Sequence, residues 1–481
     1  MLPRLKFVRT LSLISFFYLF SSCTLGPDYK KPILPFDDSS WIKGDKNRQE
    51  DAGSVDKEWW KGFKDPELTR LIQEAQQSNY DIRISEKNLE RSRAFLTQSE
   101  ASLFPNLSAE GSATRRQLSE TAGIPVGPGN PRIQNFYSAG LTSNWEIDIF
   151  GGRRRAIAAA YARYQSLDEK RRDTLLMVAA EVARRYIELR GAQKRYAILK
   201  ENVELQKKTA DLVKKRFDAG EASSFDYSRV LAQLQSTEAQ LPNTEAEVRT
   251  LIYRLSILCG KVPEKLMSRL SLAKALPLNP RSVPLGLRSD IFRRRPDVRA
   301  AERKLEAQIQ DIGARTADLF PKFTLTGSIG YQSIGEEDFT SERSQVWSIG
   351  PGLSWPIFNA GFIRAQIRAE EVEGEMATLE YEKTVLLAIA DAESAFTDYG
   401  YELETTKKLR KAVATRNKNI SLSRKRYESG LESLINLIDT EGAALMSQQE
   451  LVVSETKSLI KLVKLYKSLG GGWQALEKGT Q

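Results

Sequence analysis

Histidine and cysteine, the side chains that most often carry out chemistry in proteins, are nearly absent from this sequence. The 481-residue chain has no histidine, which excludes histidine-based acid–base catalysis, Ser-His-Asp triads and histidine-ligated zinc or haem. Its two cysteines, Cys23 and Cys259, are too few for a disulfide scaffold or an all-cysteine metal site. No Walker, dinucleotide-binding or metal-loop motif occurs. The residue types therefore argue against an enzyme and predict no metal or other cofactor.

Cys23 lies where a covalent modification is expected. Three basic residues precede an apolar run over residues 11–20, and two serines lead directly into Cys23. This layout is typical of a secretory signal, and the run is too short to span a bilayer. Small residues before a cysteine resemble a bacterial lipoprotein signal, in which the thiol is acylated once residues 1–22 are removed. We expect a covalent lipid on Cys23, which would tether the chain to a membrane. The alternative is a plain signal peptide with an incidental cysteine.

The charge balance does not indicate a nucleic-acid partner. The 72 Lys and Arg residues exceed the 62 Asp and Glu residues by a net charge of +10, which is modest for this length. The arginine runs at 153–155 and 293–295 begin helical stretches, and we expect them to be solvated or to face lipid headgroups. Cys259 lies in an apolar stretch and is expected to be a small core residue.

An internal repeat organises the rest of the chain. The matching segments are 79–83 with 295–299 and 103–105 with 319–321, both 216 positions apart. From Trp145 and Trp355 onward the offset is 210. The change falls in a polar loop around residues 123–131, where length variation is readily tolerated. Such self-similarity predicts a duplicated fold. The predicted divisions are a signal peptide (1–22), an acylated extension (23–64), a first repeat (65–275), a second repeat (276–473) and a tail (474–481).

Four stretches alternate apolar with small polar residues, as β-strands do. They are residues 105–116 and 136–150 in the first repeat and 321–333 and 345–358 in the second. Strands of this length with aromatic residues near their ends are typical of an outer-membrane β-barrel, and a soluble hairpin packed on helices is the alternative. Four strands cannot close a barrel, and an open edge cannot persist in lipid. Two copies would give a barrel filled by its own side chains, whereas three copies give twelve strands and a lumen.

Long helices follow each pair of strands. Residues spaced by seven from Val182 to Phe217 recur 210 positions later, from Ala392 to Tyr427. A seven-residue repeat sustained over this length predicts coiled-coil packing. Gly220 and Gly430 interrupt the pattern, and glycine can end a helix and let the chain turn back. Each repeat is therefore expected to contribute a long helical hairpin with its tip at one of these glycines.

The chain resembles the TolC-like outer-membrane factor family, in the lipoprotein branch that serves RND-type drug-efflux systems. The segments that carry the resemblance are CTLGPDYKKP (23–32), RRRPDVRAAE (293–302), WEIDIFGG (145–152), WPIFNAG (355–361), the paired tips RFDAG and RYESG, and LYKSLGGGW (465–473). The resemblance implies a mainly helical chain with a transmembrane β part, whose homotrimer joins a twelve-stranded outer-membrane barrel to a periplasmic helical barrel. It also implies a periplasmic adaptor (membrane fusion protein) docked on the helical tips and an inner-membrane RND-type pump.

The resemblance further implies roles for residues near the tips. In the family, a ring of acids with tyrosine and arginine contacts, following the tip glycines, closes the periplasmic end. Counted from the two tip glycines, the gate candidates are Asp226, Tyr427, Asn436 and Asp439. Gly220 and Gly430 themselves are candidates for adaptor docking.

Two departures from the family pattern argue against an arginine-mediated lock and predict a less negative constriction. Asn436 replaces an acid, and Glu432 stands where some relatives carry an arginine. A ring of carboxylates at a narrow point favours cations and relaxes on protonation. The alternative is that Asp226 and Asp439 are helix-start carboxylates stabilised by the helix dipole.

The sequence thus favours a passive outer-membrane exit duct for small molecules such as drugs. One alternative is the duct of a type I protein secretion system. A second is a coiled-coil structural lipoprotein without a lumen. An enzyme is the weakest hypothesis, because no nucleophile and base can be located.

Overall fold

The computed structural model describes residues 24–32, 57–119, 121, 127, 131–279 and 290–477. Most of these residues are helical and four strands form a sheet, which confirms the predicted fold class for the single chain. The predicted signal peptide and Cys23 lie outside the described residues, as do most of the predicted loop at 123–131 and the end of the predicted tail. Within the described ranges, no helix combines the length and the apolar character needed to cross a membrane.

The chain divides into two compact units, and each unit draws on both sequence repeats. The strand unit comprises Met1–Pro32, Leu89–Ser166 and Ala301–Tyr381. The helical unit comprises Ile33–Asn88, Leu167–Ala300 and Glu382–Gln481. The division therefore does not follow the duplication, and its boundaries, apart from the one after Pro32, fall within the four helices Tyr80–Ala101, Gly152–Asp218, Pro296–Thr316 and Phe362–Glu428.

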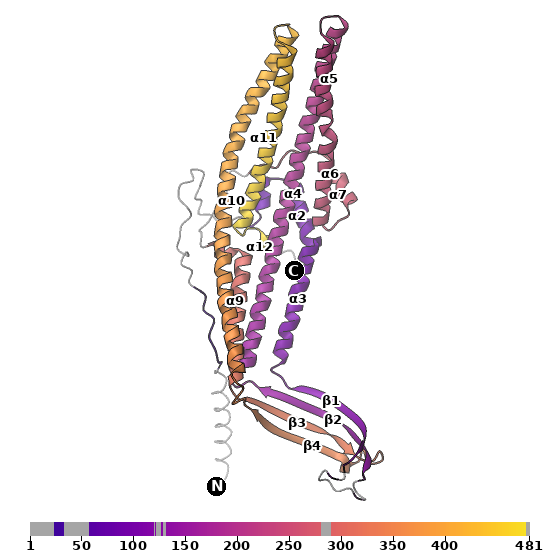
Figure 1. Cartoon of the computed structure of the whole chain (residues 1–481), viewed down its shortest axis with the longest axis vertical. Coiled ribbons are helices and arrows are strands. Elements are labelled where there is room, and N and C mark those ends of the chain that lie inside the picture. Colours follow the sequence, from indigo (N-terminus) through magenta and orange to yellow (C-terminus); the bar gives the residue numbers. More distant parts are fainter. Residues whose placement is uncertain are drawn as a thin grey trace. The chain divides into compact units, whose positions relative to one another are not determined.

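The strand unit contains one antiparallel sheet with the strands in chain order (Figure 1). The strands are β1 (Asn106–Gln117), β2 (Ile133–Ile147), β3 (Lys322–Ser333) and β4 (Gln345–Ser354). β2 ends three residues before the expected boundary because Asp148 turns away and accepts hydrogen bonds from the amides of Arg153 and Arg154. β4 ends at Ser354, before Pro356, which has no N–H to donate to a ladder.

In the middle of the sheet, the strand register aligns side chains of the same type across all four strands. One row of directly paired residues is Ser108, Thr142, Ser328 and Ser348. The next row, on the opposite face, is Ala109, Leu141, Ile329 and Trp347. Because the side-chain period of a strand is two, these rows define a polar face and an apolar face.

Two tryptophans fix the ends of the strand pairs in the same way in both repeats. The indole Nε1 of Trp145 donates to the carbonyl of Leu103 at 2.8 Å. The indole Nε1 of Trp355 donates to the carbonyl of Leu319 at 3.0 Å. In each repeat, the bond connects the turn that precedes the first strand (β1 or β3) to the end of the second strand (β2 or β4).

The helices account for the remaining elements. Those of the first repeat are η1 (Trp59–Phe63), α2 (Pro66–Ser78), α3 (Tyr80–Ala101), α4 (Gly152–Asp218), α5 (Ser224–Glu238), α6 (Gln240–Leu258) and α7 (Pro263–Leu270). Those of the second repeat are α8 (Asp290–Arg294), α9 (Pro296–Thr316), η2 (Ala317–Leu319), η3 (Glu342–Ser344), α10 (Phe362–Glu428), α11 (Leu434–Ser468) and α12 (Trp473–Glu477). α4 and α10 both have 67 residues, as the duplication predicts.

The return arm of the first hairpin is split, unlike the single second long helix that the sequence pattern predicts. α5 ends at Glu238 and α6 starts at Gln240, whereas α11 runs unbroken. Pro242 explains the difference, since proline lacks an N–H and its ring clashes with the carbonyl four residues earlier. The corresponding residue of the second repeat is Val452, which continues its helix.

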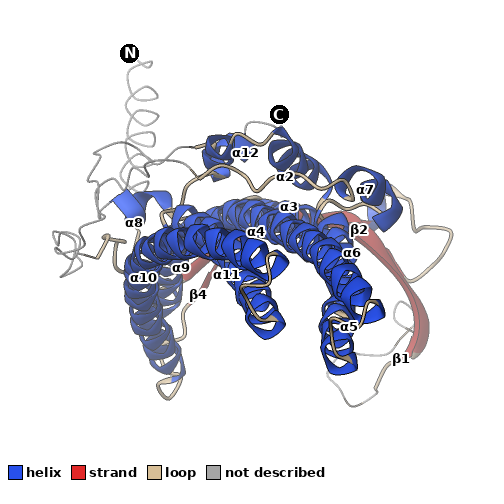
Figure 2. Cartoon of the chain, turned by 90° about the horizontal axis from the view of Figure 1, so that it is seen from above, coloured by secondary structure: helices blue, strands red, loops and turns tan. Residues whose placement is uncertain are grey.

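Four helical columns of the helical unit pack in a curved row, seen along their axes in Figure 2. α11 lies between α10 and α4, because it bonds to both through Glu441. The column of α5 and α6 lies on the other side of α4, where Arg195 pairs with Glu247. Seven-residue spacing marks the buried seam, at Val182, Leu189, Val203 and Ala210 in α4. Phe217, the last member of that series, is exposed near the tip.

The two arginine runs differ from expectation. Arg155 is 6% exposed and its guanidinium binds the carbonyls of Leu25 and Gly26. Arg295 is also largely enclosed, and it pairs with Asp297 at 2.7 Å. These two side chains are therefore structural and not solvated charge. Cys259 is buried as expected, and burial raises the pKa of its thiol to about 12.

Candidate functional site

The two helical tips are built by the same backbone device. α4 ends ahead of Gly220, which has φ +78°, and α10 ends ahead of Gly430, which has φ +74°. In each tip the amide after the glycine donates to a carbonyl five residues earlier, from Glu221 to Arg216 and from Leu431 to Arg426, both at 2.8 Å. This pattern ends a helix and favours glycine in the left-handed conformation. The structure thus confirms both predicted turns.

Asp226 lies at the start of α5 and completes a capping box. Its backbone amide donates to the Ser223 hydroxyl at 3.1 Å, and its carboxylate accepts from the Ser223 backbone amide at 3.4 Å. Reciprocal bonds of this kind satisfy amides that a helix start leaves unpaired. Asp226 therefore has the helix-start role that the alternative interpretation gave it.

Asn436 occupies the equivalent position at the start of α11, and Asp439 does not. The Asn436 amide donates to Ser433 Oγ, and its side-chain Nδ2 donates to Glu432 Oε1 at 2.7 Å. Asp439 lies one helical turn further on, is exposed, and makes no cap. The helix-start interpretation consequently fits Asp226 and fails for Asp439.

Asn436 and Asp439 line one groove between α10 and α11. The groove has a volume of about 300 Å³, and Arg416 and Asn419 of α10 complete its polar wall. A carboxylate, a guanidinium and two amides make this wall suited to hydrated ions and polar solutes. In the described part of the chain, Asp226 shares no hydrogen bond or ion pair with the other three gate candidates.

Tyr427 is buried at the tip and joins the two hairpins through an arginine that the sequence analysis missed. Its ring is 6% exposed and packs in a cluster that includes Val213 of α4 and Leu437 of α11. The Arg216 guanidinium lies 4.8 Å from the ring centroid. It also donates to the carbonyls of Tyr427 and Glu428, at 3.4 and 3.2 Å. We call this set of contacts the tip clasp.

The repeat gives Arg216 a counterpart that behaves differently. Arg426 stands at the same distance before its tip glycine, but it pairs with Glu432 at 3.2 Å and donates to the Leu431 carbonyl within its own turn. Arg216 alone of the two bridges α4 to α10. Arg216 is the first residue of the motif RFDAG, but counting acids and tyrosine from the tip glycines does not select it.

A buried carboxylate supports the hairpins behind the tip. Glu441 of α11 is 3% exposed, accepts from Arg424 of α10 at 2.6 Å and from the Thr209 hydroxyl of α4 at 3.2 Å. Burial raises the pKa of Glu441, and the Arg424 charge opposes that rise. This side chain ties three helical columns together.

The polar face of the sheet forms a second candidate surface. A groove of about 320 Å³ runs over it, lined by Asn106, Ser108, Thr142, Ser143, Asn144, Thr326, Gly327, Ser328 and Ser348. Hydroxyl and amide groups form hydrogen bonds with water and with polar solutes, and because they are neutral they do not bind either anions or cations strongly. On the opposite face, Ile329 is 52% and Trp347 is 72% exposed. One face is thus suited to water and the other to an apolar medium.

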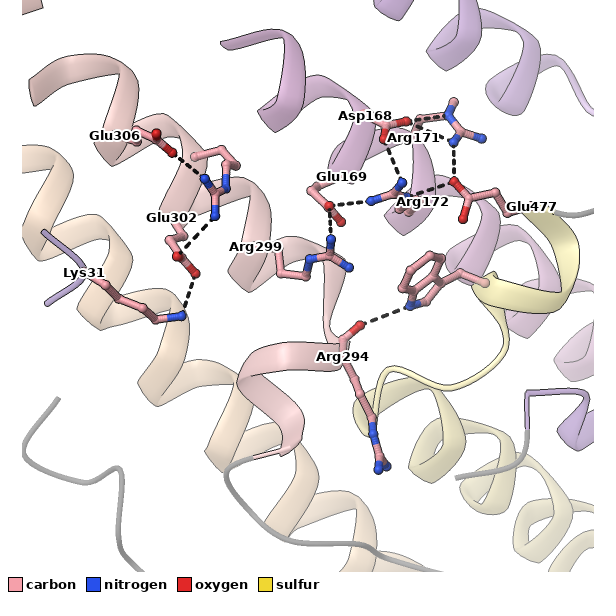
Figure 3. A network of polar contacts seen from close by, with 12 residues as sticks. Lys31, Asp168, Glu169, Arg171, Arg172, Arg294, Arg299, Glu302, Glu306 and Glu477 are labelled. Carbon is pink, nitrogen blue, oxygen red and sulfur yellow. Dashed lines mark hydrogen bonds and ion pairs between the residues drawn. The ribbon is translucent and has the colours of Figure 1, made fainter. Parts of the chain in front are cut away.

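The motif LYKSLGGGW forms a latch in the helical unit (Figure 3). Two guanidinium groups lie near the Trp473 ring, that of Arg172 at 5.1 Å and that of Arg299 at 5.6 Å from the ring centroid. Glu169 pairs with both arginines at 2.5 Å. The indole Nε1 donates to the Arg294 carbonyl at 3.0 Å. The latch joins α4, α9 and α12.

The segment that follows Cys23 is tied to the strand unit. Arg155 Nη2 pairs with Asp28 at 2.8 Å, and Lys31 pairs with Glu302 at 2.9 Å. Thr24 lies against Gly151, where an added Cβ would come within 2.9 Å of its Cα. Because Thr24 directly follows Cys23, this contact holds the chain close to the end of β2. Acylation of Cys23 itself stays a prediction.

Comparison with known proteins identifies similar chains over nearly the whole length. The family model described as outer membrane efflux protein matches residues 71–261 and 287–471. The solvent efflux pump outer membrane protein SrpC of Pseudomonas putida is 31% identical over 464 residues, covering 95% of this chain and 96% of its own. The outer membrane protein OprJ of Pseudomonas aeruginosa is 29% identical, covering 94% and 93%.

Solved structures agree with these matches. The outer-membrane channel OprN is 32% identical with a TM-score of 0.85, over 94% of this chain and all of that chain. The outer membrane channel CmeC of Campylobacter jejuni is 22% identical with a TM-score of 0.87, over 94% and 95%, a likeness of fold alone.

Proposed function

The chain belongs to the outer membrane efflux protein family, and we propose that three copies of it form the exit duct of a tripartite efflux pump. It is an outer-membrane channel component of an efflux system, like its relative SrpC. The family consists of channel proteins, and we assign this chain passive conduction of small molecules without enzymatic activity.

The continuous polar and apolar faces of the sheet carry the proposal. In the middle of the sheet, one row of paired residues carries only hydroxyl groups (Ser108, Thr142, Ser328 and Ser348), and the next row, on the opposite face, carries only apolar side chains (Ala109, Leu141, Ile329 and Trp347). A sheet in a bilayer must close on itself, because its edges cannot find water. Four strands per chain reach the width of a solute-conducting barrel when three chains contribute twelve strands. The polar face then lines the lumen.

The tips supply the gate in this proposal. The tip clasp holds the first hairpin to the second, so that opening requires Arg216 to leave Tyr427 and the end of α10. Asp439 places one carboxylate per chain in a polar groove, and three chains would place a ring of them at the constriction. Asn436 is uncharged, so each chain contributes one carboxylate to this ring. The ring is therefore less negative than it would be with an acid at both position 436 and position 439.

The partners follow from the same features. A periplasmic adaptor would dock on the turns at Gly220 and Gly430, where no atom lies within 4 Å of an added Cβ and the backbone is accessible. The adaptor would connect the duct to an inner-membrane RND-type pump, which supplies the energy. A lipid on Cys23 would anchor the chain in the outer membrane beside the strand ends that Thr24 contacts. No nucleic-acid partner is proposed.

Deletion and complementation test the proposed function. Loss of the gene should increase susceptibility to drugs or solvents, and plasmid-borne wild-type chain should restore resistance. The secreted proteins are compared in the same strains. A changed secretome with unchanged susceptibility would replace efflux by type I protein secretion. A strain altered in neither property, with the chain present in the outer membrane, would favour a structural lipoprotein.

A further inference from the structure

A charged pocket lies in the strand unit, at the end of the sheet where the helices begin. It has a volume of about 500 Å³ and is lined by residues of β2, α4, α9, β3 and α10. Small-molecule sites in proteins usually measure about 300–1,000 Å³. Glu146 and Lys322 place its mouth on the polar face of the sheet, because they lie an even number of residues from Asn144 and Thr326 of the polar groove. The pocket therefore continues that groove toward the helices.

Three close ion pairs form part of the pocket wall. They join Arg153 to Glu146 at 2.7 Å, Lys322 to Asp318 at 2.8 Å, and Arg163 to Asp311. In each pair the two charges compensate one another at short range, so neither partner needs a further counter-ion. These pairs fix the shape of the wall and leave the binding of a solute to other side chains.

Arg315 of α9 is the cation of this pocket that lacks a close partner. Its nearest carboxylate oxygens are those of Asp318 at 3.5 Å and Glu370 at 3.7 Å. Hydrogen bonds from a guanidinium are about 2.7–3.2 Å long, so both contacts are too long. Among the residues that the structure describes, none accepts a hydrogen bond from Arg315, and its side chain is 47% exposed. Its planar fork of donors is thus available to a carboxylate.

Glu370 of α10 is the corresponding anion. Its carboxylate accepts from Gln308 Nε2 at 2.7 Å and forms its ion pair with Arg315 at the long distance of 3.7 Å. A second acid is close by: burial raises the pKa of Asp311, the charge of Arg163 opposes that rise, and the charge of Glu370 adds to it. Two neighbouring carboxylates repel each other, and a positive group beside Glu370 relieves that repulsion.

We propose that this pocket binds small zwitterionic solutes, with Arg315 taking the carboxylate and Glu370 the ammonium group. The inference rests on the duct proposed above, and it names a class of solute that the wall of the duct retains. A solute with both charges gives both side chains a close, charge-assisted hydrogen bond. A singly charged solute leaves one of them with its long contact. A zwitterionic lipid headgroup has similar chemistry, but its acyl chains would have to lie on the face of the sheet that is suited to water.

Two penicillins that differ by one amino group test the assignment. Ampicillin carries an ammonium group and a carboxylate, whereas benzylpenicillin carries the carboxylate without the amine. Single-channel recording of the full-length protein in planar bilayers measures how far each compound reduces the current. Ampicillin should halve the current at a several-fold lower concentration than benzylpenicillin does.

Substitutions then test each charge separately. Arg315→Gln should weaken the block by both penicillins several-fold, because both present a carboxylate. Glu370→Gln should weaken the block by ampicillin several-fold and should not weaken the block by benzylpenicillin. The matched controls are Arg368→Gln and Glu371→Gln, which remove an exposed cation and an exposed acid of α10 outside the pocket. Both controls should behave as the wild type does.

The contrary results separate this site from the duct itself. Equal block by the two penicillins, or no block by either, would overturn the zwitterion site in a channel that conducts. Equal effects of the pocket variants and the controls, all trimeric by native mass, would also overturn it and leave the duct intact. A wild-type protein that is monomeric and does not conduct would overturn the duct and this site together.

Discussion

Removing the Arg216 side chain should open the tip more often. In Arg216→Ala the contact with the Tyr427 ring and the bonds to the carbonyls of Tyr427 and Glu428 are lost. A cation–π contact with a partly buried ring contributes about 0.5–2 kcal/mol, and two long bonds to carbonyls contribute about 0.5 kcal/mol each. The clasp is therefore worth about 1.5–3 kcal/mol per chain.

That free energy converts directly into a change of open probability. If the clasp exists only in the closed tip, losing about 1.5–3 kcal/mol per chain raises the open-to-closed ratio of each tip roughly 10- to 150-fold. Single-channel recording in planar bilayers measures this ratio. Arg426→Ala is the matched control, because the exposed pair of Arg426 with Glu432 stays within one turn and is worth about 0–1 kcal/mol.

The refuting results are specific. An Arg216→Ala channel with the wild-type open probability, still trimeric by native mass, would show that the clasp does not hold the gate. An equal effect of Arg426→Ala would show that any lost tip arginine loosens the turn, and that bridging of the hairpins is not the cause.

Three further predictions concern the constriction, a buried acid and the latch. Asp439→Ala should raise the single-channel conductance, because it removes the carboxylate that retains cations. Asn436→Asp should increase cation selectivity. An unchanged conductance of Asp439→Ala would remove Asp439 from the gate. Burial and then the Asp297 carboxylate raise the pKa of Asp173 to about 6, so its ionised form lowers stability above pH 6 and this penalty fades as pH falls. Asp173→Asn should therefore raise the thermal midpoint at pH 7.5 and raise it less at pH 5; an equal gain at both values would contradict the pKa shift. Trp473→Ala should cost about 3–5 kcal/mol of stability and Trp473→Phe clearly less, as measured by thermal melts in detergent. Equal losses would show that the indole bond to the Arg294 carbonyl, which both variants lack, holds the latch and that the ring contacts do not.

The sequence predicts features that depend on local pattern. Alternation located the strands to within a few residues, and Gly220 and Gly430 marked the turns because a positive φ is cheap for glycine. The duplication predicted one very long helix in each repeat, and α4 and α10 both have 67 residues. Pro242 also indicates the split between α5 and α6. The seven-residue spacing of apolar residues does not reveal it, because that spacing contains no information about a missing backbone N–H.

Features that depend on distant partners were not predictable in this way. Arg216 meets Tyr427 across 211 positions, and nothing near Arg216 distinguishes it from Arg426, which stays within its own turn. From the sequence, Arg155 is indistinguishable from the two arginines beside it, and only the structure shows that the segment at Leu25 covers it. Burial of a guanidinium is decided by what packs over it, and the local sequence does not contain that information.

The native mass of the detergent-extracted mature protein tests the central claim most directly, because four strands per chain make a barrel only when chains combine. The account predicts a trimer that carries a lipid on each of its three N-termini. A stable monomer that remains in solution without detergent would contradict it, since its sheet would then not be part of a membrane barrel.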